Sequence, residues 1–118
     1  MRNLLVVLCL VLSSSFVWSQ TEWNFNRMIA PDGQEYLVRG KVTIGQSFLI
    51  INVNGDALEL YLHKSEKITM NGILTVKGSF TDSVGDLVYI YVPKEGKEMM
   101  ILEVVRTQQF LIFYNEKQ

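Results

Sequence analysis

The feature that most constrains this chain is a two-residue alternation of side chains over residues 68–81. A repeat of two over this length is what a β-strand with one buried and one solvent-facing side produces, whereas a helix repeats every 3.6 residues. The pattern predicts one long strand over 68–80. We expect one side of this strand to be buried and the other exposed, the first side carrying Leu74, Val76 and Phe80 and the second Thr75, Lys77 and Ser79.

Two shorter stretches, 35–44 and 57–63, alternate in the same way. Strands with one polar side belong to antiparallel sheets, because parallel sheets bury both sides. Asn54-Gly55 is a strong hairpin signal, since both residues tolerate the positive φ of a tight turn. Further turn-forming clusters lie at 31–33, 45–46, 64–67, 82–86 and 93–96. Their close spacing favours a meander of hairpins.

The sequence therefore predicts an all-β fold: a single antiparallel meander of seven or eight strands that forms a small barrel, with a two-sheet sandwich as the alternative. The expected strands are 23–29, 35–45, 47–53, 57–63, 68–80, 86–92, 98–106 and 109–114. Residues 97–103 are good helix formers, so a helix is the alternative there. Val104 and Val105 favour the strand.

The first nineteen residues have the three parts of a secretory signal peptide. Arg2 provides positive charge, residues 4–12 are an uncharged apolar run, and Val17 and Ser19 fit a cleavage before Gln20. A membrane-spanning helix needs about 20 apolar residues, which this run does not reach. We expect a cleaved signal at 1–19, a single domain at 20–118 and no integral membrane segment after cleavage.

Removal of the signal would also remove Cys9, the only cysteine. Small exported domains of eukaryotes usually carry disulfides, so a cysteine-free one favours a bacterial periplasm or cell surface. Residues 20–118 hold ten Lys and Arg against twelve Asp and Glu, a net charge of −2. The sequence has no run of basic residues, so it does not predict a nucleic-acid partner. His63 alone does not predict a metal site, and no cofactor motif is present.

Catalytic signatures are absent from the sequence, since no serine stands in a Gly-x-Ser-x-Gly turn and no Cys-His pair can form after cleavage. Residues 38–43 and 76–81 are weakly alike, which alternating strands also produce by chance. If that likeness were a duplication, Glu59 and Glu103 would occupy matching places and could act as an acid and base pair. A small hydrolase or isomerase using these residues is one alternative, but we expect a protein that is not an enzyme.

The segment 87–92 is apolar on both sides. If Val88, Ile90 and Val92 face the core, Tyr89 and Tyr91 form a ridge on the other side. Tyrosine brings apolar area with a polar tip, so this ridge is the candidate partner or ligand surface. The alternative is a central strand covered by its neighbours. The large inward-facing residues predict a packed interior without a sizeable central cavity.

A tryptophan on the first strand, Trp23, followed by a hairpin meander is similar to lipocalin-like barrels. The chain departs from that pattern because it lacks the matching glycine before Trp23 and is shorter. The resemblance implies, as an alternative, a carrier of a small apolar ligand. The favoured hypothesis is a secreted or periplasmic non-catalytic binding or interaction module, whose protein or small-molecule partner the sequence does not specify.

Overall fold

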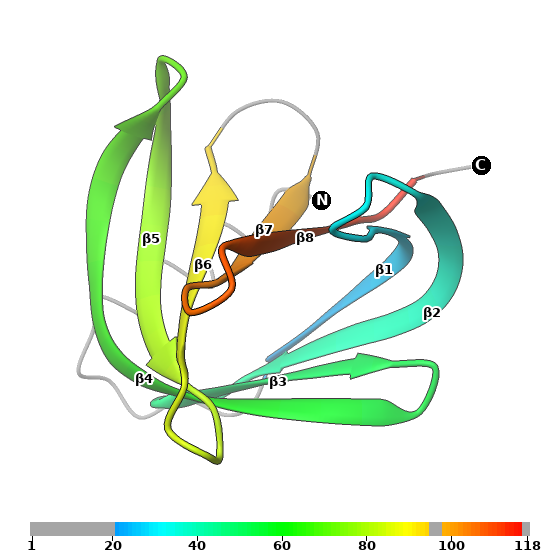
Figure 1. The fold of residues 1–118 in the computed structure, drawn as a ribbon, viewed down its shortest axis with the longest axis horizontal. Coiled ribbons are helices and arrows are strands. Elements are labelled where there is room, and N and C mark those ends of the chain that lie inside the picture. Colours follow the sequence, from blue (N-terminus) through cyan, green and yellow to red (C-terminus); the bar gives the residue numbers. More distant parts are fainter. Residues whose placement is uncertain (1–20, 95–97, 117–118) are drawn as a thin grey trace.

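Residues 21–94 and 98–116 are described by a computed structural model, so the predicted signal peptide at 1–19 lies outside the described residues. The described chain forms eight antiparallel strands that close into one barrel, each strand pairing with the next and β1 with β8 (Figure 1). The predicted all-β barrel is thereby confirmed. Its strands are β1 Thr21–Ile29, β2 Glu35–Ile44, β3 Phe48–Val53, β4 Asp56–Met70, β5 Ile73–Thr81, β6 Leu87–Pro93, β7 Met99–Val104 and β8 Gln109–Tyr114.

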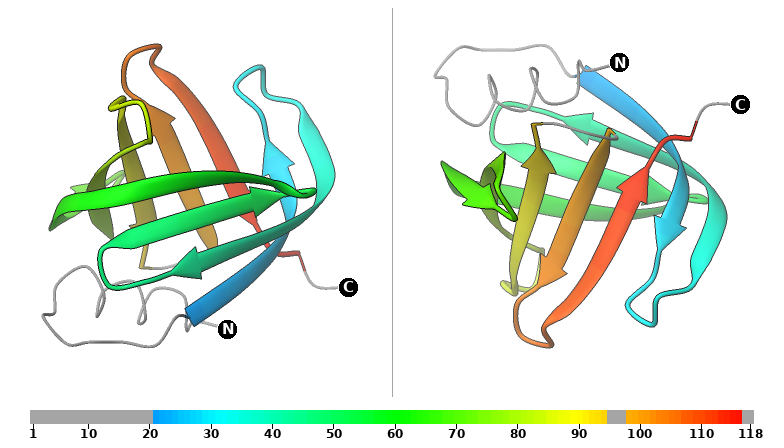
Figure 2. Two further views of the ribbon diagram at one scale, coloured as in Figure 1. Left: turned by 90° about the horizontal axis from the view of Figure 1, so that it is seen from below. Right: turned by 90° about the horizontal axis from the view of Figure 1, so that it is seen from above.

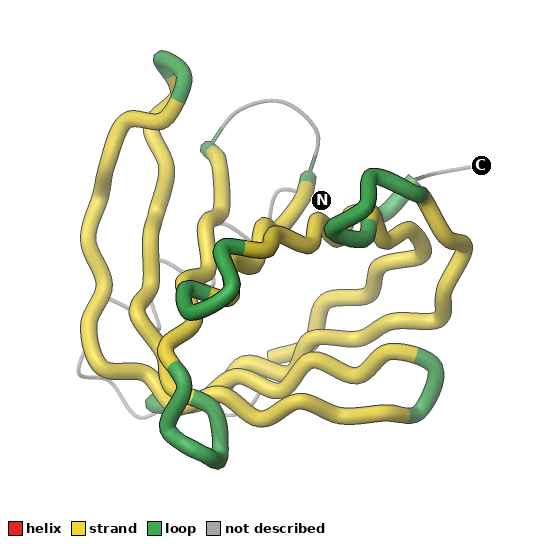
Figure 3. Tube along the Cα trace, in the orientation of Figure 1, coloured by secondary structure: helices red, strands yellow, loops and turns green. Residues whose placement is uncertain are grey.

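Short loops and turns join the strands of the barrel (Figure 3). Asn54 and Gly55 adopt positive φ values of 53° and 96° and join β3 to β4, as the hairpin signal predicted. Residues 99–104 form strand β7 and not a helix. Apart from the boundary between β4 and β5, the predicted strand ends differ from the observed ones by at most two residues.

The turn predicted at 64–67 is wrong, because β4 continues without interruption to Met70. The chain instead reverses at Asn71 and Gly72, which have φ values of 51° and 78°. Because the turn contains two residues, the alternation of apolar and polar side chains stays in phase across it. The sequence of the two strands therefore resembles that of a single strand. The β4–β5 hairpin extends away from the rest of the barrel in Figure 1.

The predicted burial over this segment is partly wrong as well. Val76 and Phe80 are buried, but Leu74 is 41% exposed because it lies in the projecting hairpin. Thr75 and Ser79 are buried although they were expected to be exposed. On the outer side of the sheet Thr75 is flanked by Ile68 on β4 and by Pro93 on β6. A position on the outer side of a strand therefore does not by itself make a side chain exposed.

In a meander, each connection between strands lies at the opposite end of the barrel from the connection before it. We call the end with the β1–β2, β3–β4, β5–β6 and β7–β8 hairpins the mouth, and the end where β1 begins the closed end. Figure 2 shows β3 and β4 crossing over the wall that β6, β7 and β8 form. Between these walls the side chains of Leu60, Phe80, Ile90 and Met100 are at most 1% exposed and form the centre of the core.

Aromatic side chains fill the closed end. Trp23 is buried, and its ring centroid lies 5.6 Å from that of Phe25, which in turn lies 4.8 Å from that of Phe113. The Trp23 Nε1–H donates to Glu98 Oε1 over 3.1 Å. Gly40 makes room for this packing, because a Cβ there would overlap the ring of Phe25. The chain of rings thus runs from the closed end towards the mouth.

Candidate functional site

The mouth of the barrel contains an apolar recess with a volume of about 290 Å³. Five strands contribute to it, namely β1, β3, β4, β7 and β8. It is lined by Met28, Ile51, Val53, Asp56, Ala57, Leu58, Leu102, Val104, Leu111 and Phe113. Ligand pockets usually measure about 300–1,000 Å³ and often lie in barrel mouths. At about 290 Å³ the recess lies at the lower limit of this range, so only a small ligand would fit.

The chemistry of the recess follows from the alternation of its strands. Leu102 and Leu111 are cross-strand partners on β7 and β8, and both side chains point inward. Across from them lie Val53 on β3 and Leu58 on β4. Asp56 at the β3–β4 hairpin is the one ionisable side chain among the described lining residues. An apolar surface with one polar group at its rim suits an apolar ligand whose polar end stays in water.

The sequence predicts a packed interior without a sizeable central cavity, and the section around Leu60 and Phe80 is packed. The recess is an open concavity at the mouth and not an enclosed central cavity, so it does not contradict that prediction. Some of the large residues expected to face inward are nevertheless partly exposed near this end. Tyr36 and Leu58 are 43% and 39% exposed. Leu58 faces the recess, whereas Leu60 on the same strand is fully buried.

The candidate residues Tyr89 and Tyr91 lie on the outer side of β6, since Val88, Ile90 and Val92 belong to the core. Their rings meet edge to face with centroids 6.3 Å apart. Lys77 Nζ lies 4.0 Å from the centroid of Tyr89, a cation–π contact. Tyr91 is mostly buried, and its hydroxyl donates to Glu103 Oε1 over 2.6 Å. The pKa of Tyr91 is raised from 10.0, first by burial and then by Glu103.

Glu59 and Glu103 do not come together. Glu59 is on β4 and Glu103 on β7, with β5 and β6 between them in the barrel. Each accepts a hydrogen bond from a tyrosine hydroxyl, Glu59 from Tyr61 over 2.8 Å and Glu103 from Tyr91. The bond to Glu59 raises the pKa of Tyr61 above 10.0. The acid and base pair considered from the sequence therefore has no geometric basis.

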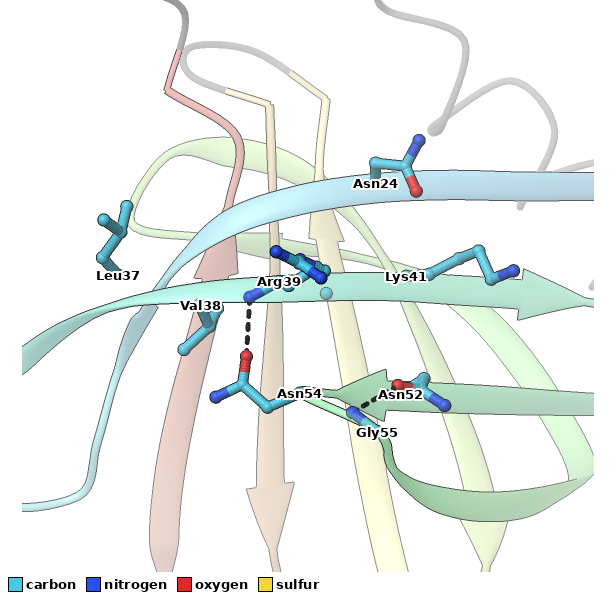
Figure 4. Close-up of a pocket in the computed structure, with 9 residues that line it drawn as sticks. Asn24, Leu37, Val38, Arg39, Lys41, Asn52, Asn54 and Gly55 are labelled. Carbon is cyan, nitrogen blue, oxygen red and sulfur yellow. Dashed lines mark hydrogen bonds between the residues drawn. The ribbon is translucent and has the colours of Figure 1, made fainter.

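A second concave region, of about 960 Å³, lies on the outer surface of β1, β2 and β3 (Figure 4). We call it the outer groove. Its lining residues are Asn24, Leu37, Val38, Arg39, Gly40, Lys41, Asn52, Asn54 and Gly55. Asn24, Lys41 and Asn52 are direct cross-strand neighbours and form one row over the three strands. The sequence did not reveal this row, because it depends on the register of three strands.

Metal-binding groups are not found within 21–94 and 98–116: no three His, Asp or Glu side chains gather there as a metal site requires. Asp82 Oδ1 instead accepts hydrogen bonds from the backbone N–H groups of Val84 and Asp86, over 3.0 and 2.9 Å. These bonds stabilise the turn between β5 and β6. No helix in the described part of the chain is long and apolar enough to span a membrane.

Fold and recess together define the molecule as an eight-stranded antiparallel meander barrel with an apolar recess at its mouth. Comparison of the chain with protein-family models, with curated proteins and with solved structures found no match.

Proposed function

We propose that this chain is an exported, non-catalytic binding protein that holds a small apolar ligand in the mouth recess. The observation that carries the proposal is the recess itself, an apolar space of about 290 Å³ lined from five strands of a closed barrel. Transfer of an apolar ligand from water to such a surface contributes about 25 cal/mol per Å² of area buried. The alternation that builds the barrel supplies this surface without any special motif.

Export rests on the sequence of residues 1–19, and the absence of cysteine from 20–118 favours a bacterial periplasm or cell surface. A barrel in that location could bind an apolar molecule and carry it through water. The rim residue Asp56 is exposed, so the open end of the recess provides the entry route for the ligand.

Fluorescence titration with N-phenyl-1-naphthylamine, an apolar probe, tests the proposal. Leu58→Trp places a larger side chain in the recess and should weaken probe binding by about tenfold or more, because binding needs that space. Leu87→Trp is the matched control, since Leu87 is 37% exposed and lies on the outer side of β6 near the same end. It should bind the probe as the unchanged protein does.

Two results would contradict the proposal. One is absence of probe binding by the unchanged protein at micromolar concentrations. The other is equal binding by Leu58→Trp and the unchanged protein, which would place the probe elsewhere on the surface. Circular dichroism of both tryptophan variants should first show the same β signal, so that lost binding is not lost folding.

A protein partner for the outer surface around Tyr89 is the second candidate function, to which the mostly buried Tyr91 contributes little area. Across the outer side of β6, β7 and β8 the cross-strand row Tyr89, Glu103 and Phe110 places apolar rings on both sides of one carboxylate. Phe110 is 47% exposed. A photo-crosslinking amino acid at position 89 should form an adduct in the native host that the same amino acid at exposed Tyr61 does not form. Equal labelling at both positions would count against this surface.

A further inference from the structure

Two of the three asparagines that line the outer groove present hydrogen-bond donors to it, because structural bonds occupy the side-chain oxygens of Asn52 and Asn54. Asn54 Oδ1 accepts from the Arg39 backbone N–H over 2.8 Å, and Asn52 Oδ1 accepts from the Gly55 N–H over 3.0 Å (Figure 4). A backbone N–H can only donate, so each amide must direct its oxygen to the backbone. The Nδ2 groups of Asn52 and Asn54 remain to donate to something else.

Two cations lie beside these amides. Lys41 is partly neutralised, since its Nζ lies 3.4 Å from Glu22 Oε2 and both side chains are about half exposed. The exposed Arg39 guanidinium makes no ion pair or side-chain hydrogen bond within the described residues. Glu22 does not line the groove, and neither does any other described carboxylate. The positive charge of Arg39 is therefore available to an anionic ligand.

We propose that the outer groove binds a short acidic saccharide. The planar guanidinium of Arg39 can hold a carboxylate through two parallel hydrogen bonds. The Nδ2 groups of Asn52 and Asn54 can donate to hydroxyl and ring oxygens of the sugar. Exposed Leu37 at the edge of the groove offers an apolar contact for the C–H side of a pyranose ring. A volume of about 960 Å³ accommodates more than one sugar unit.

This site is separate from the mouth recess, because the two share no lining residue. The two proposals can therefore fail independently. Arg39→Gln should leave binding of N-phenyl-1-naphthylamine in the recess unchanged, whereas Leu58→Trp should leave saccharide binding unchanged.

The test is an NMR titration of the ¹⁵N-labelled protein with trigalacturonate, a carboxylated trisaccharide. The side-chain amide signals of Asn52 and Asn54 should shift as the ligand binds. Maltotriose is a neutral trisaccharide, and citrate is a carboxylate without sugar rings. The groove should bind each of them at least about tenfold more weakly than trigalacturonate. Arg39→Gln should weaken trigalacturonate binding by about tenfold, the effect of losing a charge-assisted pair. Arg106→Gln, the same change in the β7–β8 hairpin, should not.

Three outcomes would overturn the assignment. If maltotriose binds as well as trigalacturonate, the positive charge has no role. If citrate binds as well, the groove recognises anions and not sugars. If trigalacturonate leaves the Asn52 and Asn54 amide signals unchanged, the groove is not the site.

Discussion

The two ends of the barrel are built from the same strands but are filled differently. Leu60 and Leu58 both point inward from β4, yet Leu60 has no exposed surface and Leu58 is 39% exposed. At the closed end the rings of Trp23 and Phe25 occupy the interior. At the mouth, aliphatic side chains face one another across an open space. Side-chain packing at one end can therefore stabilise a barrel of this size, while the other end keeps space for a ligand.

Replacement of leucine by alanine in the packed core and at the mouth should have the largest difference in effect. Leu60→Ala should lower the free energy of unfolding by about 2–5 kcal/mol, because it leaves a cavity in the packed section. Leu58→Ala should cost less than about 1 kcal/mol, since its side chain is already partly in water. Urea unfolding of both variants measures the difference. Equal losses would mean that the mouth is packed as tightly as the centre of the core.

The close packing of the closed end can be tested at its smallest residue. Gly40→Ala should cost about 1–3 kcal/mol, because the added methyl group overlaps the ring of Phe25. Phe25→Leu in the same chain should recover part of that loss, since leucine frees the space that the methyl group needs. A double-mutant cycle in urea measures the recovery. Additive effects of the two changes would show that Gly40 and Phe25 do not compete for space.

A smaller effect is expected on the outer wall, where Tyr91 donates to Glu103. The pKa of Tyr91 is raised in the folded protein from its ordinary 10.0, so the folded state keeps a proton that the unfolded chain loses. The stability from this pair is therefore complete below pH 10 and declines as the pH rises above it. Tyr91→Phe should lose about 1 kcal/mol at neutral pH and show a shallower decline above pH 10.

Unfolding curves between pH 7 and pH 11.5 measure that decline. Glu103→Gln removes the carboxylate charge and leaves Tyr91 buried, so its decline should lie between those of the unchanged protein and Tyr91→Phe. If all three proteins lose stability in parallel above pH 10, the titration of Tyr91 is not linked to folding.

Much of the fold could be predicted from the sequence because local chemistry and the two-residue repeat agree. Turn residues such as Asn54 and Gly55 end strands where the hydrophobic pattern also ends. The outer position of Tyr89 follows from the burial of Val88 and Ile90. The strand at 99–104 shows that cross-strand pairing decides where propensity alone favours a helix.

The β4–β5 hairpin could not be predicted for a physical reason. The register between the two strands shifts between Leu62 and Lys64, and such a bulge moves all later side chains to the opposite side. Ile68 therefore lies on the outer side with Thr75, while Val76 on β5 faces inward. An alternating sequence contains no sign of an added residue. The two-residue turn at Asn71 then preserved the appearance of one strand.

Neither concave site could be predicted, because both depend on distances between strands. The sequence contains the large residues of the mouth, such as Leu102 and Leu111, but not the gap that separates them from Leu58. Likewise it contains Lys41 and Asn52, but their adjacency is a property of the β2–β3 register.

Methyl NMR tests whether an apolar ligand enters the mouth and not the closed end. The protein would be labelled at its Leu and Val methyl groups and titrated with N-phenyl-1-naphthylamine, whose rings shift nearby signals. We predict that the signals of Leu58, Leu102, Val104 and Leu111 shift, while those of Val42 and Leu60 stay in place. Shifts confined to Leu87 on the outer wall, or no shifts in the mouth at saturating probe, would contradict ligand binding in the mouth recess.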